Sequence, residues 1–204
     1  DGIPLSFFAH VKRSGFSLGQ RKGRKRLVVM FPGASSRSKS HRDYQRHAWS
    51  GDLVDHDVIV FTDPSLDPSN EIGLAWFQYS TRRYGIDAVE TLLRLLIDNH
   101  GYEDRDVTLF GSSGGGFVAL QLAKVFPEVA VVAINPQIHL FNYTKAHYEA
   151  MLNVCYPSMT DNEVRAKYPE RMSVVINPFE RRAPTVVFQN TEDIRHVRRH
   201  LQPL

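Results

Sequence analysis

The glycine-rich segment Gly-Ser-Ser-Gly-Gly-Gly at residues 111–116 restricts the fold of this chain more than any other feature. A short apolar run at 107–110 precedes it, and a mostly apolar segment at 117–126 follows it. These flanks predict a buried strand, a tight turn and a helix, in that order. A turn so rich in glycine allows backbone conformations and close approaches that other residues would prevent.

Within this segment, residues 111–115 match the pattern G-x-S-x-G with Ser113 at the centre. The frame centred on Ser112 is excluded, because it would require glycine where Phe110 stands. The pattern predicts that Ser113 is a nucleophile on a sharp strand-to-helix turn and that the N–H of Gly114 stabilises an oxyanion. One alternative is a turn that only lets a helix pack closely. Another is a phosphate-binding loop, although the Lys-Ser/Thr pair of such loops is missing.

The rest of the chain alternates between apolar runs and segments of helical spacing. Four more buried strands are predicted at 27–31, 57–61, 129–134 and 185–188. Residues 81–100 predict an amphipathic helix, because their apolar side chains share one face and Gly101 follows as a stop signal. Apolar strands that alternate with helices indicate an α/β fold, a mostly parallel sheet with helices on both faces.

The length of 204 residues is typical of one domain or slightly more. We divide the chain into an N-terminal basic segment, 1–25, and a single α/β domain, 26–204. Residues 138–180 interrupt the alternation, with helical stretches around 144–155 and 160–168. We interpret them as a helical cap inserted over the carboxyl ends of the strands. The alternative is a crossover helix with a long surface loop.

Composition excludes several classes of protein. With 42% hydrophobic and 23% charged residues, and no apolar run near the ~20 residues of a membrane-spanning helix, the chain is neither a membrane protein nor disordered. The single Cys155 excludes an intramolecular disulfide. Asp43 and His47 could share a helix face, but no third ligand stands at a recognised spacing, so neither a metal nor another cofactor is predicted.

A basic run at 21–26 carries five positive charges in six residues. Such a run can bind nucleic acid or another anionic polymer, or it can be a solvated turn that leads into a strand. No RNA-binding signature or zinc-finger spacing accompanies it, and we predict no nucleic-acid partner.

The strand, the G-x-S-x-G turn and the following helix together resemble the α/β-hydrolase family of serine esterases and acyltransferases. The resemblance implies a second oxyanion donor after the first predicted strand, for which we choose the N–H of Ala34. It also implies an acid after the strand at 185–188. Residues 189–193, Gln-Asn-Thr-Glu-Asp, are similar to the family's Gly-Thr-x-Asp ending, which makes Asp193 the acid and Glu192 the fallback. The alternative is that Asp193 only caps the helix that follows.

The same resemblance implies a catalytic histidine after one further strand, and the sequence stops at Leu204 before such a strand. Either the chain is truncated and the true base lies beyond residue 204, or a nearby histidine serves. His196 is our candidate, because residues 193–196 also match the D-x-x-H pair of the SGNH esterases, although the early Gly-Asp-Ser block of that family is missing. His200 lies four residues further on, and His139 is expected to be a surface or packing residue.

A weaker resemblance is carried by Phe-Pro-Gly-Ala at 31–34, by the block at 62–66 with Trp-Phe-Gln at 76–78 after it, and by residues near the end of the chain, namely Gln189, Asn190, Asp193, His196, His200 and Pro203. These look like bacterial hydrolase-like proteins linked to surface glycans, including O-acetyltransferases of accessory Sec export systems. The aromatic residues near this block, Trp76, Phe77 and Tyr79, could stack on a sugar or pack in the core.

Together these features predict a serine hydrolase of the carboxylesterase or deacetylase type. It would act on a small-molecule or glycan ester through an acyl-enzyme at Ser113. The alternatives are an O-acyltransferase that acts on a glycan, and a non-catalytic module that binds a glycan or an anionic polymer.

Overall fold

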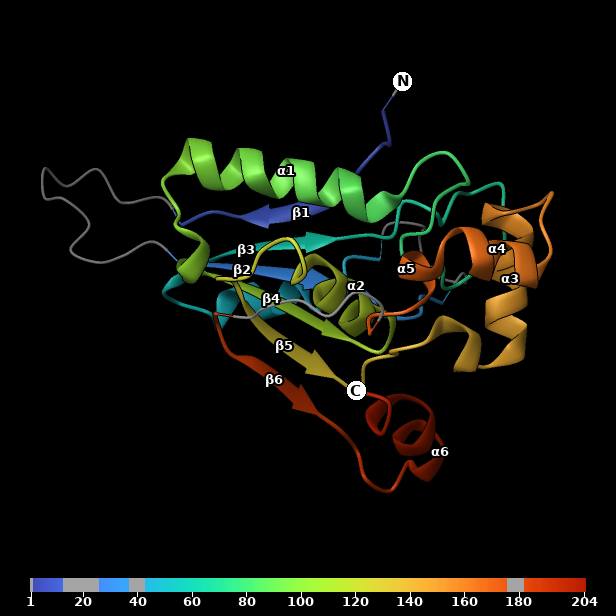
Figure 1. Cartoon of the computed structure of the whole chain (residues 1–204). Helices are drawn as coiled ribbons and strands as arrows, with labels where there is room; N and C mark the ends of the chain where they lie inside the picture. The colour runs from blue at the N-terminus through green and yellow to red at the C-terminus, as the bar shows by residue number, and fades with distance from the viewer. Residues whose placement is uncertain (1, 13–25, 37–42, 176–181) are drawn as a thin grey trace, which may run out of the picture.

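The computed structural model describes residues 2–12, 26–36, 43–175 and 182–204 (Figure 1). Most of the basic run at 21–26 therefore lies outside the described residues. Within them, a six-stranded sheet has the order β1-β3-β2-β4-β5-β6. Its strands are β1 (Phe7–His10), β2 (Arg26–Phe31), β3 (His56–Phe61), β4 (Val107–Ser112), β5 (Ala130–Ile134) and β6 (Thr185–Phe188). All neighbouring pairs are parallel except β1 with β3, so the predicted α/β fold with a mostly parallel sheet is confirmed.

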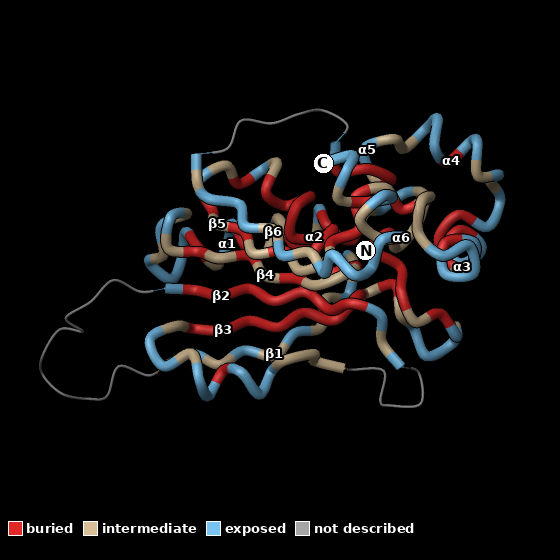
Figure 2. The backbone as a smooth tube through the Cα atoms, turned by 90° about the horizontal axis from the view of Figure 1, so that it is seen from below, coloured by how far each residue is buried: buried red, intermediate tan, exposed pale blue. Residues whose placement is uncertain are grey.

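The edge strand β1 is the one described strand that the sequence did not predict. Its four residues, Phe-Phe-Ala-His, alternate between exposed and half-buried, so they form no apolar run. An antiparallel edge strand needs an apolar side chain on only one face of the sheet. In β1 this side chain is Phe8, which packs against the small apolar cluster that contains Val58 and Val60 of β3. Strands β2 and β3 are largely buried, as Figure 2 shows, and β4 and β5 alternate between buried and half-buried residues. The strand at 185–188 was predicted to be buried, but β6 is the other edge strand of the described sheet and three of its four residues are exposed.

Two α-helices pack on the same face of the sheet and on each other: α1 (Gly85–His100) and α2 (Gly114–Leu122). Helix α1 begins four residues later than predicted and ends at His100 as predicted. Gly101 follows as its C-cap, with the left-handed φ of 71° expected of that glycine. Helix α2 begins three residues earlier than predicted, directly after Ser113. The sequence predicts a turn at Gly114, Gly115 and Gly116, but these glycines form the first turn of the helix.

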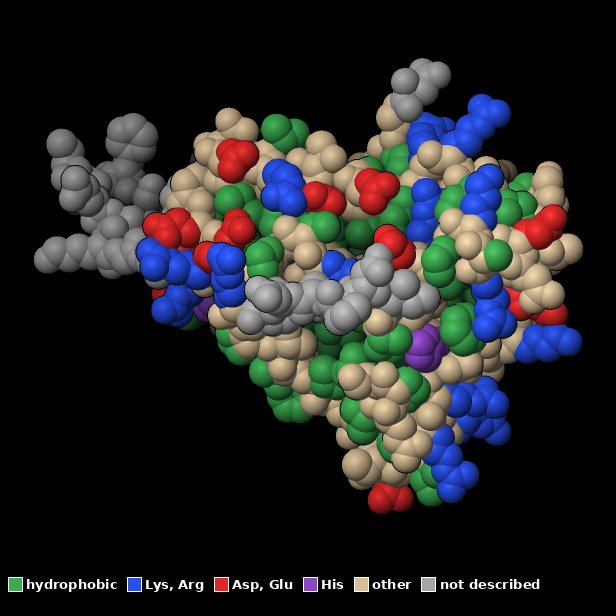
Figure 3. Space-filling model, in the orientation of Figure 1, with side chains coloured by type: hydrophobic (Ala, Val, Ile, Leu, Met, Phe, Trp, Pro, Cys, Tyr) green, Lys and Arg blue, Asp and Glu red, His purple; other side chains and the backbone are tan. Residues whose placement is uncertain are grey.

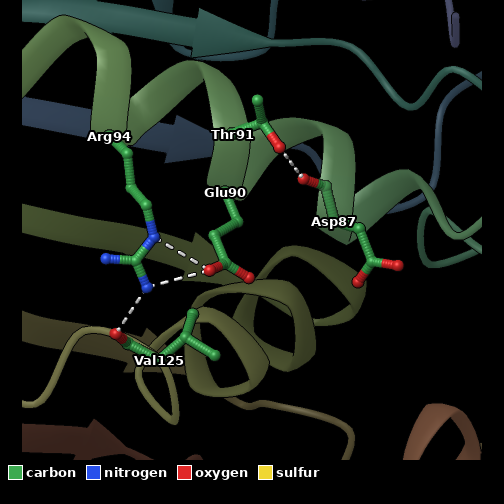
Figure 4. A network of polar contacts seen from close by, with 5 residues as sticks. All are labelled: Asp87, Glu90, Thr91, Arg94 and Val125. Atoms are coloured by element: carbon green, nitrogen blue, oxygen red, sulfur yellow. Dashed lines mark hydrogen bonds and ion pairs between the residues drawn. The ribbon is translucent and has the colours of Figure 1, made fainter.

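A polar network links α1 to the end of α2 (Figure 4). Arg94 pairs with Glu90 at 2.8 Å within α1 and donates a 3.2 Å hydrogen bond to the carbonyl of Val125. Its guanidinium also lies over the ring of Phe126. This contact holds α1 beside the segment that follows α2, and therefore supports the helix that begins at the predicted nucleophile.

The sheet separates a large hydrophobic core from a small one. The large core lies between the sheet, α1, α2 and the helices that follow β5, and it includes Phe31, Phe117 and Leu109. On the other face, Val28, Met30, Val58 and Val60 pack under Phe8, Tyr44, Leu53 and Phe110, next to the 3-10 helix η1 (His47–Gly51). The site described below stands above the large core.

Short helices lie beyond the carboxyl ends of the parallel strands (Figure 1). They are η3 (Leu140–Asn142), α3 (Lys145–Cys155), α4 (Asp161–Lys167) and α5 (Pro169–Met172). Helices α3 and α4 match the predicted stretches, and Thr160 with Glu163 forms a capping box at the start of α4. After β6, α6 (Ile194–His196) continues into a π-helical turn, η4 (Val197–Leu201). The remaining element is the 3-10 turn η2 (Asp104–Asp106).

The described residues contain neither a membrane-spanning helix nor a cluster of metal-ligating side chains. None of their helices is both long enough and apolar enough to cross a membrane. Nor do they bring three His, Cys, Asp or Glu side chains together in a group that could hold a metal ion.

Candidate active site

Ser113 stands at the junction of β4 and α2 in a strained backbone conformation. Its φ of 55° and ψ of −119° lie in a region that non-glycine residues rarely adopt, at a cost of about 1–3 kcal/mol. Backbone hydrogen bonds hold it there: its N–H donates to the carbonyl of Ile134, and its carbonyl accepts from the N–H groups of Gly116 and Gln137. The side chain remains half-buried rather than packed in the core.

The glycines around Ser113 are required by close contacts. A Cβ on Gly115 would overlap the backbone oxygen of Phe31, and a Cβ on Gly111 would overlap the backbone of Gly115 itself. A Cβ on Gly114 would lie 2.5 Å from Cδ1 of Leu74. The turn therefore has the sharp geometry that the G-x-S-x-G pattern predicts.

The loop after β2 lies beside Ser113, where the second oxyanion donor was expected. A Cβ built on Gly33 would lie 3.6 Å from the Cβ of Ser113. Gln45 holds this loop, because its side chain accepts from the N–H of Gly33 at 3.0 Å and donates to the carbonyl of Ala34 at 3.0 Å. The N–H groups of Ala34 and Gly114 make no hydrogen bond to any described residue. Both candidate donors are thus available to a ligand.

The hydroxyl of Ser113 contacts a residue that the sequence analysis did not single out. The side-chain Nε2 of Gln137 donates a 2.6 Å hydrogen bond to Ser113 Oγ, and the indole N–H of Trp76 donates to Gln137 Oε1 at 2.8 Å. No histidine within the described chain is hydrogen-bonded to Ser113 Oγ.

Trp76 and Phe77 are each 1% exposed and belong to the core. Of the two alternatives given for them, stacking on a sugar or packing in the core, the structure shows the second. Their loop is strained, because Trp76, Phe77 and Tyr79 all have φ between 51° and 59°. The buried carboxylate of Asp63 holds the loop by accepting from the N–H of Phe77 at 3.0 Å. Burial raises the pKa of this carboxyl, although its hydrogen bonds act in the opposite direction.

The predicted acid and base lie together at the start of α6. The carboxylate of Asp193 accepts a hydrogen bond from the backbone N–H of His196 at 3.0 Å. Asp193 therefore caps α6, which is the alternative to the catalytic acid that the sequence analysis gave for this residue. It makes no hydrogen bond to the His196 ring in the described structure. Its charge nevertheless favours the protonated form of that ring. Glu192, the fallback acid, is exposed.

The orientation of the His196 ring can be derived from its neighbours. Gln189 donates through Nε2 to the carbonyl of Asn190, so its Oε1 faces His196 Nδ1 at 3.1 Å. An amide oxygen can only accept, so Nδ1 carries the proton of the neutral ring and Nε2 keeps its lone pair. Nε2 is buried and has no partner within the described chain. Burial lowers the pKa of His196, more than Asp193 raises it, and the neutral ring can accept a proton.

A second imidazole, that of His200, lies against the first, with 4.6 Å between the ring centroids and an angle of 48° between the ring planes. It is 1% exposed and its Nδ1 accepts from the N–H of Ile138 at 3.1 Å. Burial, followed by the positive charge of His196, lowers the pKa of His200 to about 4. His139, the third histidine considered, bonds to Ser173 at 2.8 Å and stacks on Phe141.

A pocket adjoins His196 and His200, and a larger groove lies beside that pocket. The pocket, of about 170 Å³, is lined by Asp193, His196 and His200 together with Tyr143, Arg199 and neighbouring residues. The groove, of about 890 Å³, shares Asn142, Tyr143 and Arg199 with it and runs between α3 and α4. Figure 3 shows Lys and Arg side chains on the side of the molecule that α3, α4 and α6 form.

A model of the uncharacterised protein family UPF0227 matches residues 74–202, which include Ser113, Gln137 and the histidine pair of α6 and η4. The chain belongs to this family. No curated protein matches the sequence.

Solved structures share its fold at low identity. A capsule O-acetyltransferase of Neisseria meningitidis serogroup A superposes with a TM-score of 0.67 at 16% identity, over 98% of this chain and 76% of that one. An S-formylglutathione hydrolase from Agrobacterium tumefaciens gives 0.51 at 13%, over 96% and 95%. The glycosylation-associated Gap123 complex of Streptococcus agalactiae gives 0.57 at 12%, over 80% of this chain but only 31% of that one. This UPF0227 chain therefore has the α/β-hydrolase fold, which esterases and acyltransferases share.

Sequence reasoning missed two glutamines of this site. Gln137 follows the Asn-Pro pair that ends β5, and Gln189 is the first residue after β6. The carboxyl ends of neighbouring parallel strands meet at one edge of the sheet. Polar residues within three positions of the ends of β5 and β6 were the signal that could have identified both glutamines.

Proposed function

We propose that the protein is a serine hydrolase of the carboxylesterase or deacetylase type that forms an acyl-enzyme at Ser113. The observation that carries this proposal is the strained turn at Ser113, with the hydroxyl next to a loop whose Ala34 N–H has no partner among the described residues. Strain of this kind persists where the surrounding structure imposes it, and it concentrates at functional sites. The fold shared with esterases agrees with this function.

In the proposed reaction, Ser113 Oγ attacks the acyl carbon of an ester while its proton passes to Nε2 of His196. The N–H groups of Ala34 and Gly114 stabilise the oxyanion. The carbon–oxygen bond to the alcohol then breaks, and the alcohol leaves with the proton from His196. Water repeats the sequence on the acyl-enzyme: it gives its proton to His196, and Oγ is expelled and regains a proton. Asp193 stabilises the charged imidazole electrostatically.

The support for His196 as the base is its depressed pKa and its unpartnered Nε2. The ring is not in contact with Ser113 Oγ, so the assignment requires it to approach when substrate binds. Catalytic hydrogen bonds often tighten only in the complex with substrate.

A second candidate function is acyl transfer to a sugar hydroxyl instead of water. The groove between α3 and α4 favours it, because it combines aromatic rings, such as Tyr143 and Phe141, with amide and charged side chains. Rings beside hydrogen-bonding groups suit a sugar, and the groove opens next to the His196 pocket. The acyl-enzyme is the same in both reactions, and only the acceptor of the acyl group differs.

The test of both candidates is pre-steady-state hydrolysis of p-nitrophenyl acetate. An acyl-enzyme at Ser113 predicts a burst of p-nitrophenol that disappears in Ser113→Ala and persists in the matched Ser112→Ala variant. Adding a neutral or uronic-acid oligosaccharide, followed by mass spectrometry of the products, separates transfer from hydrolysis. Absence of a burst, together with salt-sensitive binding of an anionic polysaccharide that Ser113→Ala leaves intact, would instead establish the non-catalytic binding module.

A further inference from the structure

Gln137 is held between Trp76 and Ser113 in a way that determines the direction of its amide. Trp76 and Gln137 are both 1% exposed, and the two hydrogen bonds of the amide measure 2.8 Å and 2.6 Å. An indole N–H can only donate, so the amide oxygen must face Trp76. The amide NH₂ must therefore face Ser113 Oγ.

This direction decides what the Ser113 hydroxyl can do. Its oxygen accepts a hydrogen bond from Gln137, so its own proton is directed elsewhere and remains available to a base. A donor aimed at a hydroxyl oxygen binds the alkoxide more strongly than the neutral hydroxyl, because hydrogen bonds to charged groups are the stronger ones. Gln137 thus favours the form of Ser113 that attacks.

The backbone of the Trp76 loop fixes the position of the indole next to the amide of Gln137. It adopts a φ of 51° at Trp76, and Asp63 accepts from the next N–H. The indole comes so close to α2 that a Cβ on Gly114 would lie 3.3 Å from its Cδ1. Packing alone does not require an amide between this indole and the serine, since an apolar side chain of the same length would fill the space.

We propose that Gln137 is a catalytic residue that donates a hydrogen bond to Ser113 Oγ, and that Trp76 is the positioning residue that orients its amide. The inference rests on the proposed acyl-enzyme and deepens it. During attack, the Oγ–H bond breaks and the Oγ–carbon bond forms while the proton moves to His196. During deacylation, the Oγ–carbon bond breaks and Oγ regains a proton. Gln137 keeps both of its hydrogens throughout and stabilises the negative charge on Oγ in each direction.

The first test is the rate at which a fluorophosphonate labels Ser113, measured across pH. Gln137→Met has a similar length and no donor, and we expect it to be labelled about 10- to 100-fold more slowly at neutral pH. The alkaline rise of its labelling rate should also move to higher pH. Gln121→Met is the matched control. Gln121 is also a buried glutamine, but it lies in α2 and donates to the carbonyl of Glu170 instead of Ser113. It should be labelled at the wild-type rate.

The second test reads the contact without any reaction. The chain has two tryptophans, so a ¹H–¹⁵N NMR spectrum should contain two indole N–H signals, and Trp76→Phe identifies one of them. In Gln137→Met the Trp76 signal should move and exchange faster with solvent, while that of the more exposed Trp49 stays in place. An unmoved Trp76 signal overturns the positioning role. If Gln137→Met does not fold, Trp76→Phe serves in its place for labelling and should react more slowly than wild type.

The outcomes separate the two proposals. Wild-type labelling at Ser113 with an equal rate and pH profile in Gln137→Met overturns the role of Gln137 and leaves the proposed function standing. No labelling of the wild type overturns the proposed function and the catalytic role of Gln137 together. The NMR result still reports whether Trp76 orients the amide.

Discussion

The backbone N–H of Ile138 donates a 3.1 Å hydrogen bond to Nδ1 of His200, which joins the segment after β5 to the turn after α6. Ile138 directly follows Gln137, so this bond connects the neighbour of Ser113 with the histidine pair. It requires an unprotonated Nδ1, and burial favours the neutral ring as well.

Stability should therefore fall when the solution is acidified. The pKa of His200 is about 4 in the folded protein, against about 6.5 for an unperturbed histidine. Between these values the unfolded chain binds more protons, so the free energy of unfolding decreases as the pH falls from about 6.5 to about 4, by up to about 3 kcal/mol. Urea denaturation of wild type and of His200→Gln measures this. Equal pH dependence of the two proteins would show that His200 is not responsible.

The turn at Ser113 should not tolerate a residue larger than glycine at position 115. Gly115→Ala places a methyl group against the backbone oxygens of Phe31 and Pro32, which cannot move aside cheaply. We expect a loss of about 3 kcal/mol in the free energy of unfolding. Gly51→Ala is the control, since a Cβ there meets nothing within 4 Å, and it should change stability by less than about 0.5 kcal/mol. Similar stabilities of the two variants would contradict this account of the turn.

The sequence was sufficient for those parts of the fold that rest on continuous apolar runs and glycine signals. The strands β2 to β6 and the turn at Ser113 were predicted for this reason, and the parallel orientation of these strands follows from the α/β pattern. Strand β1 was missed because an edge strand with one apolar side forms no such run. The helix after Ser113 begins three residues earlier than the sequence predicts, because glycine has a low helix propensity and three glycines at its start favour a turn.

The site was only partly predictable, because it depends on which side chains the sheet order brings together. Ser113 and the loop of Ala34 follow strands whose adjacency the fold class implies, and the structure places them side by side. The amide of Gln137 is oriented by Trp76, which is 61 residues away in the sequence, and the amide of Gln189 is oriented by Asn190 and faces His196. No local pattern encodes those contacts.

The partner of His196 Nδ1 should set the acidic limb of the pH–rate profile. Gln189→Glu replaces the neutral amide oxygen by a carboxylate, which stabilises the charged imidazole and raises the pKa of His196. If His196 is the base, the rise of kcat/KM with pH should move to higher pH in this variant. His196→Gln should remove the limb and nearly all turnover. Unchanged profiles in both variants would assign the base to another group.

Asp193 should contribute separately to stability and to rate. Asp193→Ala removes the cap from the N–H of His196 and should cost about 1 kcal/mol of stability, whereas Asp193→Asn retains a capping oxygen. Because only the charge is lost in Asp193→Asn, its melting temperature should stay close to that of the wild type while kcat falls. Wild-type kcat in Asp193→Asn would restrict the role of Asp193 to capping.

Peptide mapping by mass spectrometry after treatment with a fluorophosphonate tests the central assignment most directly. The account predicts a single adduct on Ser113, retained in Ser112→Ala and lost in Ser113→Ala. An unlabelled wild-type protein, or an adduct that survives Ser113→Ala, would contradict it.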